Sequence, residues 1–136
     1  MDASSGGEAE LQRVRDELVA LEPLFHHPEV TGREPADLEA LAAPDFWEVG
    51  ASGAVYSREQ VMHIVGERYT DGGGQDGQTM PVDDVRCRLL GPSTYLLTYR
   101  LRQGNRVTRR ATIWERADSL LGWRVVYHQG TVVSDG

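Results

Sequence analysis

The spacing of apolar residues changes once along the chain, and this change constrains the fold more than any other feature. Before Pro81, apolar residues recur every three or four positions, which is the period of an amphipathic helix. After Pro81 they alternate with polar residues in four strand-like runs, separated by turn signals at 91–93, 103–106 and 117–122. Helices first and strands later predict an α+β fold, with helices packed on one face of a curved antiparallel sheet.

Three helices are predicted ahead of the sheet. The second starts at Pro35 and ends at Pro44, and the third begins with a capping box formed by Ser57 and Gln60. The first runs from about residue 9 to His27, and its buried stripe consists of Leu11, Val14, Leu18, Leu21 and Phe25.

The domain boundaries follow from composition and length. Residues 1–8 are small and polar and are expected to be disordered. Residues 46–49 and 55–56 form a short pair of strands, and the glycine-rich stretch 70–78 is expected to be a flexible loop. A chain of 136 residues is short for two domains, so a single domain over residues 9–133 is predicted.

Composition excludes several classes of function. The net charge of −7 disfavours nucleic acid and anionic membranes as partners. All basic residues are Arg, so P-loop and Schiff-base lysine chemistry is excluded. Cys87 is the single cysteine, and no histidine pair has metal-ligand spacing, so we expect no metal and no cofactor. With no secretory signal and no long apolar run, the protein is expected to be cytoplasmic.

The charge is unevenly divided along the chain. Residues 1–84 hold 18 acids and five Arg, whereas residues 85–136 hold three acids and nine Arg. Two explanations stay open at this point: an acidic layer packs near a basic one and their fields cancel, or the second half forms a positive concavity that attracts an anionic ligand.

The turn at Gly104 and Asn105 predicts which side chains share a face of the sheet. A two-residue turn opposes Tyr99 with Arg110, Leu97 with Thr112, and Tyr95 with Trp114. A loop at 118–121 would oppose Trp114 with Val125, so that Tyr127 and Gln129 join the same face. His128 would then project to the opposite face, unless a bulge re-aims it.

Polar and aromatic side chains on this face suggest a ligand pocket beneath the helices. Glu48 is the best candidate for a general acid or base, with Tyr99 or Arg110 stabilising an oxyanion. The alternative is that the aromatic residues are plain core and that Arg110 pairs with Glu48. The candidate ligand-binding residues are Glu48, Tyr99, Arg110, Thr112, Trp114, Tyr127, His128 and Gln129.

Four segments together resemble a bacterial branch of the nuclear transport factor 2-like superfamily, which includes SnoaL-like cyclases and ketosteroid isomerases. The segments are residues 48–53, 98–100, 111–114 and 123–131. The resemblance implies a cystatin-like cone, in which a curved antiparallel sheet wraps three helices, leaves a pocket at its open end and usually forms a homodimer. The catalytic Asp and Tyr pattern of the isomerases is not matched, and the fold hosts many functions.

Two functions remain as hypotheses. The first is a small-molecule-binding protein for an anionic or aromatic ligand, with or without cofactor-independent acid/base chemistry of the isomerase, cyclase or dehydratase type. The second is a non-catalytic homodimeric interaction module. Its outer sheet face would form the interface through Leu96, Thr98, Ala111, Ile113 and Val126, with Arg side chains at the rim recognising an acidic partner.

Overall fold

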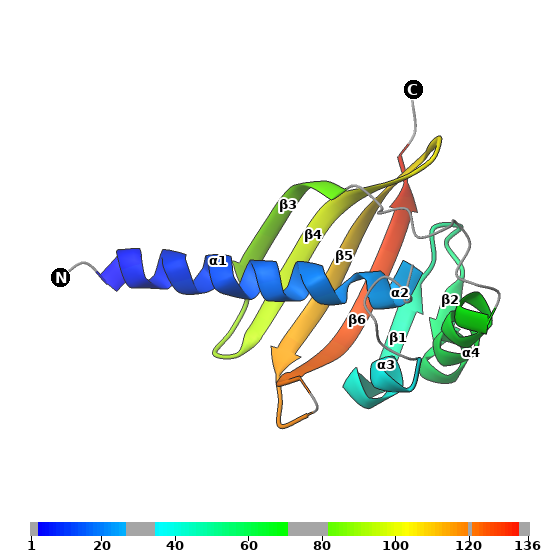
Figure 1. Ribbon diagram of the computed structural model, residues 1–136, viewed down its shortest axis with the longest axis horizontal. Coiled ribbons are helices and arrows are strands. Elements are labelled where there is room, and N and C mark those ends of the chain that lie inside the picture. Colours follow the sequence, from blue (N-terminus) through cyan, green and yellow to red (C-terminus); the bar gives the residue numbers. More distant parts are fainter. Residues whose placement is uncertain (1–2, 27–34, 71–81, 120, 134–136) are drawn as a thin grey trace.

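The computed structural model describes residues 3–26, 35–70, 82–119 and 121–133. These residues form helices and one six-stranded sheet of strand order β2-β1-β6-β5-β4-β3 (Figure 1). The α+β class expected from the sequence is confirmed. The expected glycine-rich loop lies almost entirely outside the described residues. The helices are α1 (Ala3–Leu21), α2 (Pro23–His26), α3 (Pro35–Leu41) and α4 (Arg58–Thr70); the strands are β1 (Ala42–Val49), β2 (Val55–Ser57), β3 (Val82–Leu89), β4 (Thr94–Gln103), β5 (Arg106–Arg116) and β6 (Trp123–Val132).

The helices cover one face of the sheet (Figure 1). Helix α1 contacts β3 and β4, whereas α4 packs against β1 and β2 and also contacts α3. None of the described helices is long and apolar enough to cross a bilayer.

The first helix departs from its predicted bounds at both ends. It begins at Ala3, so the expectation of disorder is wrong for residues 3–8. Once a helix has nucleated, adding a residue gains a hydrogen bond at little cost, so helical structure extends beyond the apolar stripe. The helix also stops at Leu21, because Pro23 cannot donate a backbone hydrogen bond and starts the separate turn α2.

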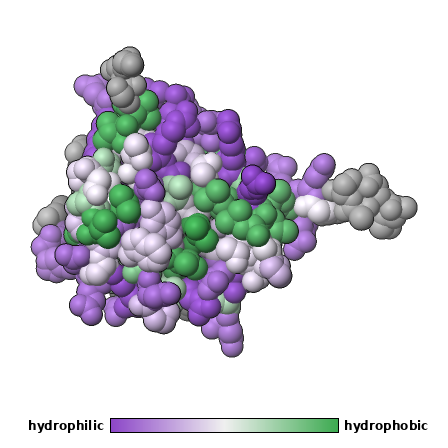
Figure 2. All heavy atoms as spheres, turned by 180° about the vertical axis from the view of Figure 1, so that it is seen from behind, coloured by the Kyte–Doolittle hydropathy of each residue, from purple (hydrophilic) through white to green (hydrophobic). Residues whose placement is uncertain are grey.

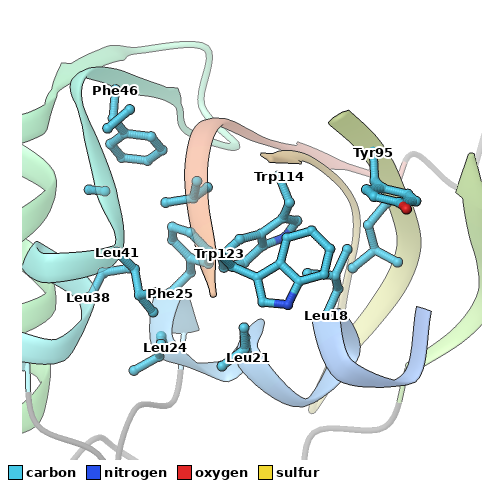
Figure 3. Packing of buried hydrophobic residues seen from close by; sticks show 14 of the residues in the cluster. Leu18, Leu21, Leu24, Phe25, Leu38, Leu41, Phe46, Tyr95, Trp114 and Trp123 are labelled. Carbon is cyan, nitrogen blue, oxygen red and sulfur yellow. The ribbon is translucent and has the colours of Figure 1, made fainter. Parts of the chain in front are cut away.

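The apolar stripe of the first helix lies in the core, as predicted. The stripe residues Val14, Leu18 and Leu21 are buried, and so is Phe25 of α2. Figure 3 shows that residues of α1 and α2 face the large aromatic side chains of the sheet. The sheet contributes the inner-face residues Tyr95, Leu97, Tyr99, Leu101, Trp114, Trp123 and Val125.

The predicted register of the central hairpin is confirmed. Tyr99 pairs with Arg110, Leu97 with Thr112 and Tyr95 with Trp114. The turn between the strands is possible because Gly104 has a φ of 64°, a backbone conformation that residues with a Cβ rarely adopt.

A β-bulge in β6 changes the predicted inner face. Trp114 pairs with Val125 as expected, but Ile113 pairs with Tyr127, which leaves Val126 as an extra residue. Beyond the bulge, the alternation of faces is reversed. His128 is therefore buried on the inner face, at 1% exposure.

Tyr127 and Gln129 accordingly lie on the outer face, and their predicted place on the inner face is wrong. The Tyr127 hydroxyl donates a hydrogen bond of 2.6 Å to Oε1 of Gln129. The Tyr127 ring also meets the exposed ring of Trp47 edge to face, at 5.2 Å between centroids.

One pair of strands is parallel rather than antiparallel. β1 runs alongside β6, and Glu48 pairs with His128 while Trp47 pairs with Tyr127. The register slips between Ala42 and Trp47, where Pro44 lies inside the strand instead of ending a helix. This pairing brings Glu48 from the first half of the chain next to the inner face of the second half.

Candidate functional site

A buried carboxylate holds together three of the predicted site residues. Glu22, at the break between α1 and α2, is 2% exposed. Its Oε1 accepts hydrogen bonds from the Tyr99 hydroxyl at 2.6 Å and from Thr112 Oγ1 at 2.9 Å. Its Oε2 accepts one from Trp114 Nε1 at 2.8 Å. Burying an ionised carboxylate is costly unless such donors replace its water shell, and here three neutral donors do so.

Glu22 is absent from the sequence-based set of site residues. A signal for it exists, because Glu22 follows Leu18 by four positions and precedes Phe25 by three, which places an acid on the apolar stripe. The residue after it is Pro23, which ends α1 at the point where the carboxylate enters the core.

The buried cluster changes the acidity of Tyr99. Burial raises the pKa of the Tyr99 phenol well above its usual value, and the negative charge and hydrogen bond of Glu22 raise it further. The positive charge of Arg110 opposes these effects without cancelling them. Tyr99 therefore keeps its proton at neutral pH and acts there as a hydrogen-bond donor.

Glu48 and His128 form a second polar pair beside this cluster. His128 Nδ1 lies 2.7 Å from Glu48 Oε2, and the Phe25 ring stacks on the imidazole at 4.2 Å between centroids. The other ring nitrogen, Nε2, lies 3.8 Å from Glu22 Oε1, which is too long for a hydrogen bond. Within the described part of the chain, this buried nitrogen has no hydrogen-bond partner.

A pocket of about 190 Å³ opens against this pair. Its walls come from α2, from the end of β1 and the turn that follows it, and from β2, α4, β5 and β6. Among the described residues it is lined by Phe25, Glu48, Val49, Gly50, Ala51, Ser52, Tyr56, Ile64, Arg106, Arg110, His128 and Gly130.

Two pocket glycines leave room for neighbouring side chains. A Cβ on Gly130 would lie 3.3 Å from Arg110 Nε, so the arginine side chain occupies space that a larger residue would take. Arg110 Nε also donates a hydrogen bond of 3.1 Å to Thr108 Oγ1. A Cβ on Gly50 would lie 2.8 Å from the Tyr56 ring, closer than real Cβ contacts. Alanine at either position would therefore force the pocket wall to move.

The predicted site residues thus separate into three groups. Glu48, Arg110 and His128 line the pocket. Tyr99, Thr112 and Trp114 surround Glu22 behind the pocket and are not among its lining residues. Tyr127 and Gln129 lie on the outer face. Direct contact between the Tyr99 hydroxyl and a ligand is therefore not supported by this geometry, and the catalytic roles of Glu48 and Tyr99 stay predictions.

Comparison with known proteins identifies the fold. An NTF2-like protein of unknown function in nutrient uptake from Rhodospirillum rubrum is 20% identical, with 90% of this chain and 98% of that chain covered and a TM-score of 0.60. A protein of unknown function from Pectobacterium atrosepticum is 16% identical, with 91% of each chain covered and a TM-score of 0.67. A cystatin-like fold protein from Burkholderia xenovorans is 12% identical, with 93% of each chain covered and a TM-score of 0.65.

The chain therefore has an NTF2-like, cystatin-like α+β fold, as the sequence resemblance implies. No family model matches it, and no curated protein does. At these identities the similarity establishes the fold alone, and a function has to be argued from the pocket.

Proposed function

We propose that the protein binds a small molecule in the pocket beside Glu48 and His128. The observation that carries this proposal is the position of an ionisable pair, joined at 2.7 Å, in the wall of a concave site. Glu48 retains 18% exposure of its side chain, whereas that of His128 is 1% exposed. Concave sites in which a few polar groups converge are a usual form of small-molecule sites.

The pair could also move a proton. Glu48 holds one carboxylate oxygen against His128 Nδ1, and its other oxygen is available to a ligand. If the ligand carries an acidic C–H beside a carbonyl, Glu48 would take that proton as a general base. Of the two predicted oxyanion partners, Arg110 is the one that lines the pocket.

The test is a thermal-shift screen of small metabolites, followed by Glu48→Gln. A ligand that binds the folded state raises the melting temperature by mass action. Glu48→Gln should change the affinity of any such ligand about tenfold or more. The free energy of unfolding should fall by no more than about 1 kcal/mol, because the amide oxygen still accepts a hydrogen bond from His128.

Glu115→Gln is the matched control, since Glu115 pairs with Arg124 on β5 and β6 but does not line the pocket. It should leave the affinity unchanged. A fall in the free energy of unfolding well above about 1 kcal/mol in Glu48→Gln, with the ligand affinity of the folded protein unchanged, would assign the pair a purely structural role and reject the proposal.

A second candidate function is self-association through the outer face of the sheet. Trp47 is 45% exposed there, and Leu96, Ile113 and Val126 are only partly buried. Figure 2 shows the side of the molecule away from α1, where hydrophobic patches lie among hydrophilic side chains. Such a face suits a second copy of the chain.

The basic side chains of the outer face favour a second copy over an acidic partner. Arg100 forms two hydrogen bonds of 2.6 Å with Asp83, and Arg109 forms one of 2.9 Å with Asp84. These charges are already met within the chain, so an acidic partner would have to compete with existing ion pairs.

A further inference from the structure

The charged residues of the pocket indicate what kind of molecule it holds. Two arginines, Arg106 and Arg110, line it, whereas Glu48 is the single acid among the described lining residues. Glu48 is also in contact with His128. Two guanidinium groups therefore stand beside one carboxylate among the described lining residues, in a chain whose total charge is −7. Guanidinium groups in the wall of a pocket favour a ligand that carries an anionic group.

The two arginines reach the pocket from the inner face of one strand. Arg106 is opposite Gln103 at the hairpin end of β5, and Arg110 is opposite Tyr99 further along. They are four residues apart, an even number, so their side chains project from the same side of the strand. Arg110 lies against Gly130, and Arg106 is exposed at the pocket. This arrangement places one guanidinium inside the site and another at its rim.

The volume and the remaining walls limit the size of the ligand. A volume of about 190 Å³ is equivalent to about six water molecules in the liquid. It is smaller than the sites that hold drug-sized molecules. The apolar side chains among the lining residues are Phe25, Val49, Ala51 and Ile64.

From these observations we propose that the pocket binds a small monocarboxylate with an apolar body. The carboxylate lies on Arg110 and is attracted by Arg106 at the rim, while the apolar body packs against Phe25 and Ile64. Arginine suits this role because its planar guanidinium can donate two parallel hydrogen bonds to one carboxylate. The proposal rests on the proposed function, since it assigns the ligand class of the same pocket.

Three probes of similar shape test the ligand charge: benzoate, the neutral benzamide and the cationic benzylamine. Binding is measured by titration followed by NMR, with the backbone amide signals of Gly50 and Gly130 as reporters of the pocket. Benzoate should shift both signals and bind at least tenfold more tightly than benzamide, and benzylamine should not bind. The benzoate affinity should also fall as salt concentration rises, because the rim arginine is exposed.

Two substitutions in the β4–β5 hairpin test whether benzoate binds in the pocket. Arg106→Gln should weaken benzoate binding about threefold to tenfold. Arg102→Gln is the matched control, because Arg102 is an exposed arginine of the same hairpin that does not line the pocket. It should leave the affinity unchanged, although it removes the same charge from the molecule.

A third variant tests the position of the inner guanidinium without removing any charge. Gly130→Ala should weaken benzoate binding, since its Cβ would displace Arg110. Arg110→Gln should weaken binding more than Arg106→Gln. The NMR spectrum shows whether each variant is folded, and Arg106→Gln keeps the test decisive if substitution at Arg110 unfolds the domain.

The possible failures are distinguishable. Equal binding of benzoate and benzamide, tighter binding of benzylamine, or equal losses in Arg106→Gln and Arg102→Gln would overturn the carboxylate assignment. In those cases the proposed function survives, provided that Glu48→Gln changes the affinity of the probe that binds. No binding of any probe would also overturn the carboxylate assignment. The proposed function itself fails only if no small molecule shows a dependence on Glu48.

Discussion

At the scale of single residues, Glu22 is the group on which the interior of the molecule is organised. One carboxylate accepts hydrogen bonds from Tyr99, Thr112 and Trp114, which come from two neighbouring strands. The carboxylate thereby connects the end of α1 to the inner face of the sheet. A buried acid held by several donors is expected to stabilise a particular packing arrangement, because each donor loses its partner if the helix shifts.

Replacing Glu22 tests this role. Glu22→Ala should lower the free energy of unfolding in urea by about 3 kcal/mol or more, because three buried donors lose their acceptor and each costs about 1–3 kcal/mol. Glu17→Ala is the control on the same helix, since Glu17 accepts only a long contact of 3.3 Å from Trp123 Nε1. Its cost should stay below about 1 kcal/mol. Equal losses in the two variants would contradict the central role of Glu22.

The raised pKa of Tyr99 predicts that the free energy of unfolding falls at alkaline pH. Burial, together with Glu22, raises the pKa of Tyr99 in the folded state. In the unfolded chain, a tyrosine has a pKa of about 10. Above that pH the unfolded chain releases a proton that the folded chain keeps, so stability falls as pH rises. In urea unfolding between neutral and alkaline pH, Tyr99→Phe should lose less stability than the wild type.

Tyr127→Phe is the comparison variant for that experiment, since the Tyr127 hydroxyl bonds only to Gln129 among the described residues, on the half-buried outer face. If Tyr99→Phe and the wild type lose stability in parallel, the Tyr99 phenol is not held in its protonated form by the fold.

At the scale of elements, local patterns predict most of the strands and their pairing. The Gly104 turn determines the register of β4 and β5, because a two-residue loop leaves little freedom in which residues face each other. The bulge at Val126 has no comparable local signal. It arises where β6 pairs with β5 on one side and with β1 on the other, and these contacts join residues far apart in sequence.

The consequence of the bulge for the site is large. A shift of one residue reverses every side chain that follows it, so His128 takes the inner position and Tyr127 with Gln129 the outer one. The positions of Tyr99, Arg110, Thr112 and Trp114 do not depend on Val126, because the register of β4 and β5 determines them.

At the scale of the whole molecule, charged side chains lie on both faces of the sheet. On the outer face, acids and arginines neutralise each other in pairs such as Asp83 with Arg100 and Glu115 with Arg124. On the inner face, Arg106 and Arg110 line the pocket together with Glu48. The two faces therefore suit different partners, so ligand binding and self-association do not exclude each other.

Self-association is tested by sedimentation equilibrium. The wild type should form a dimer, and Ile113→Glu should shift it to the monomer, because Ile113 lies opposite Leu96 in the middle of the outer face. Leu90→Glu is the control, since Leu90 is 50% exposed but lies after the end of β3, outside the strands of the sheet. A wild-type chain that stays monomeric up to its solubility limit would remove the second candidate function.

The α+β class, the buried stripe of α1 and the register of β4 with β5 follow from the sequence alone. Each depends on periodicity or on a turn within a short stretch of chain, where local sterics and burial decide the outcome. The role of Glu22, the inward position of His128 and its contact with Glu48 depend on the tertiary structure. They arise where α1, β1 and β6 meet, because only long-range packing determines which strand lies beside which and where an extra residue is absorbed.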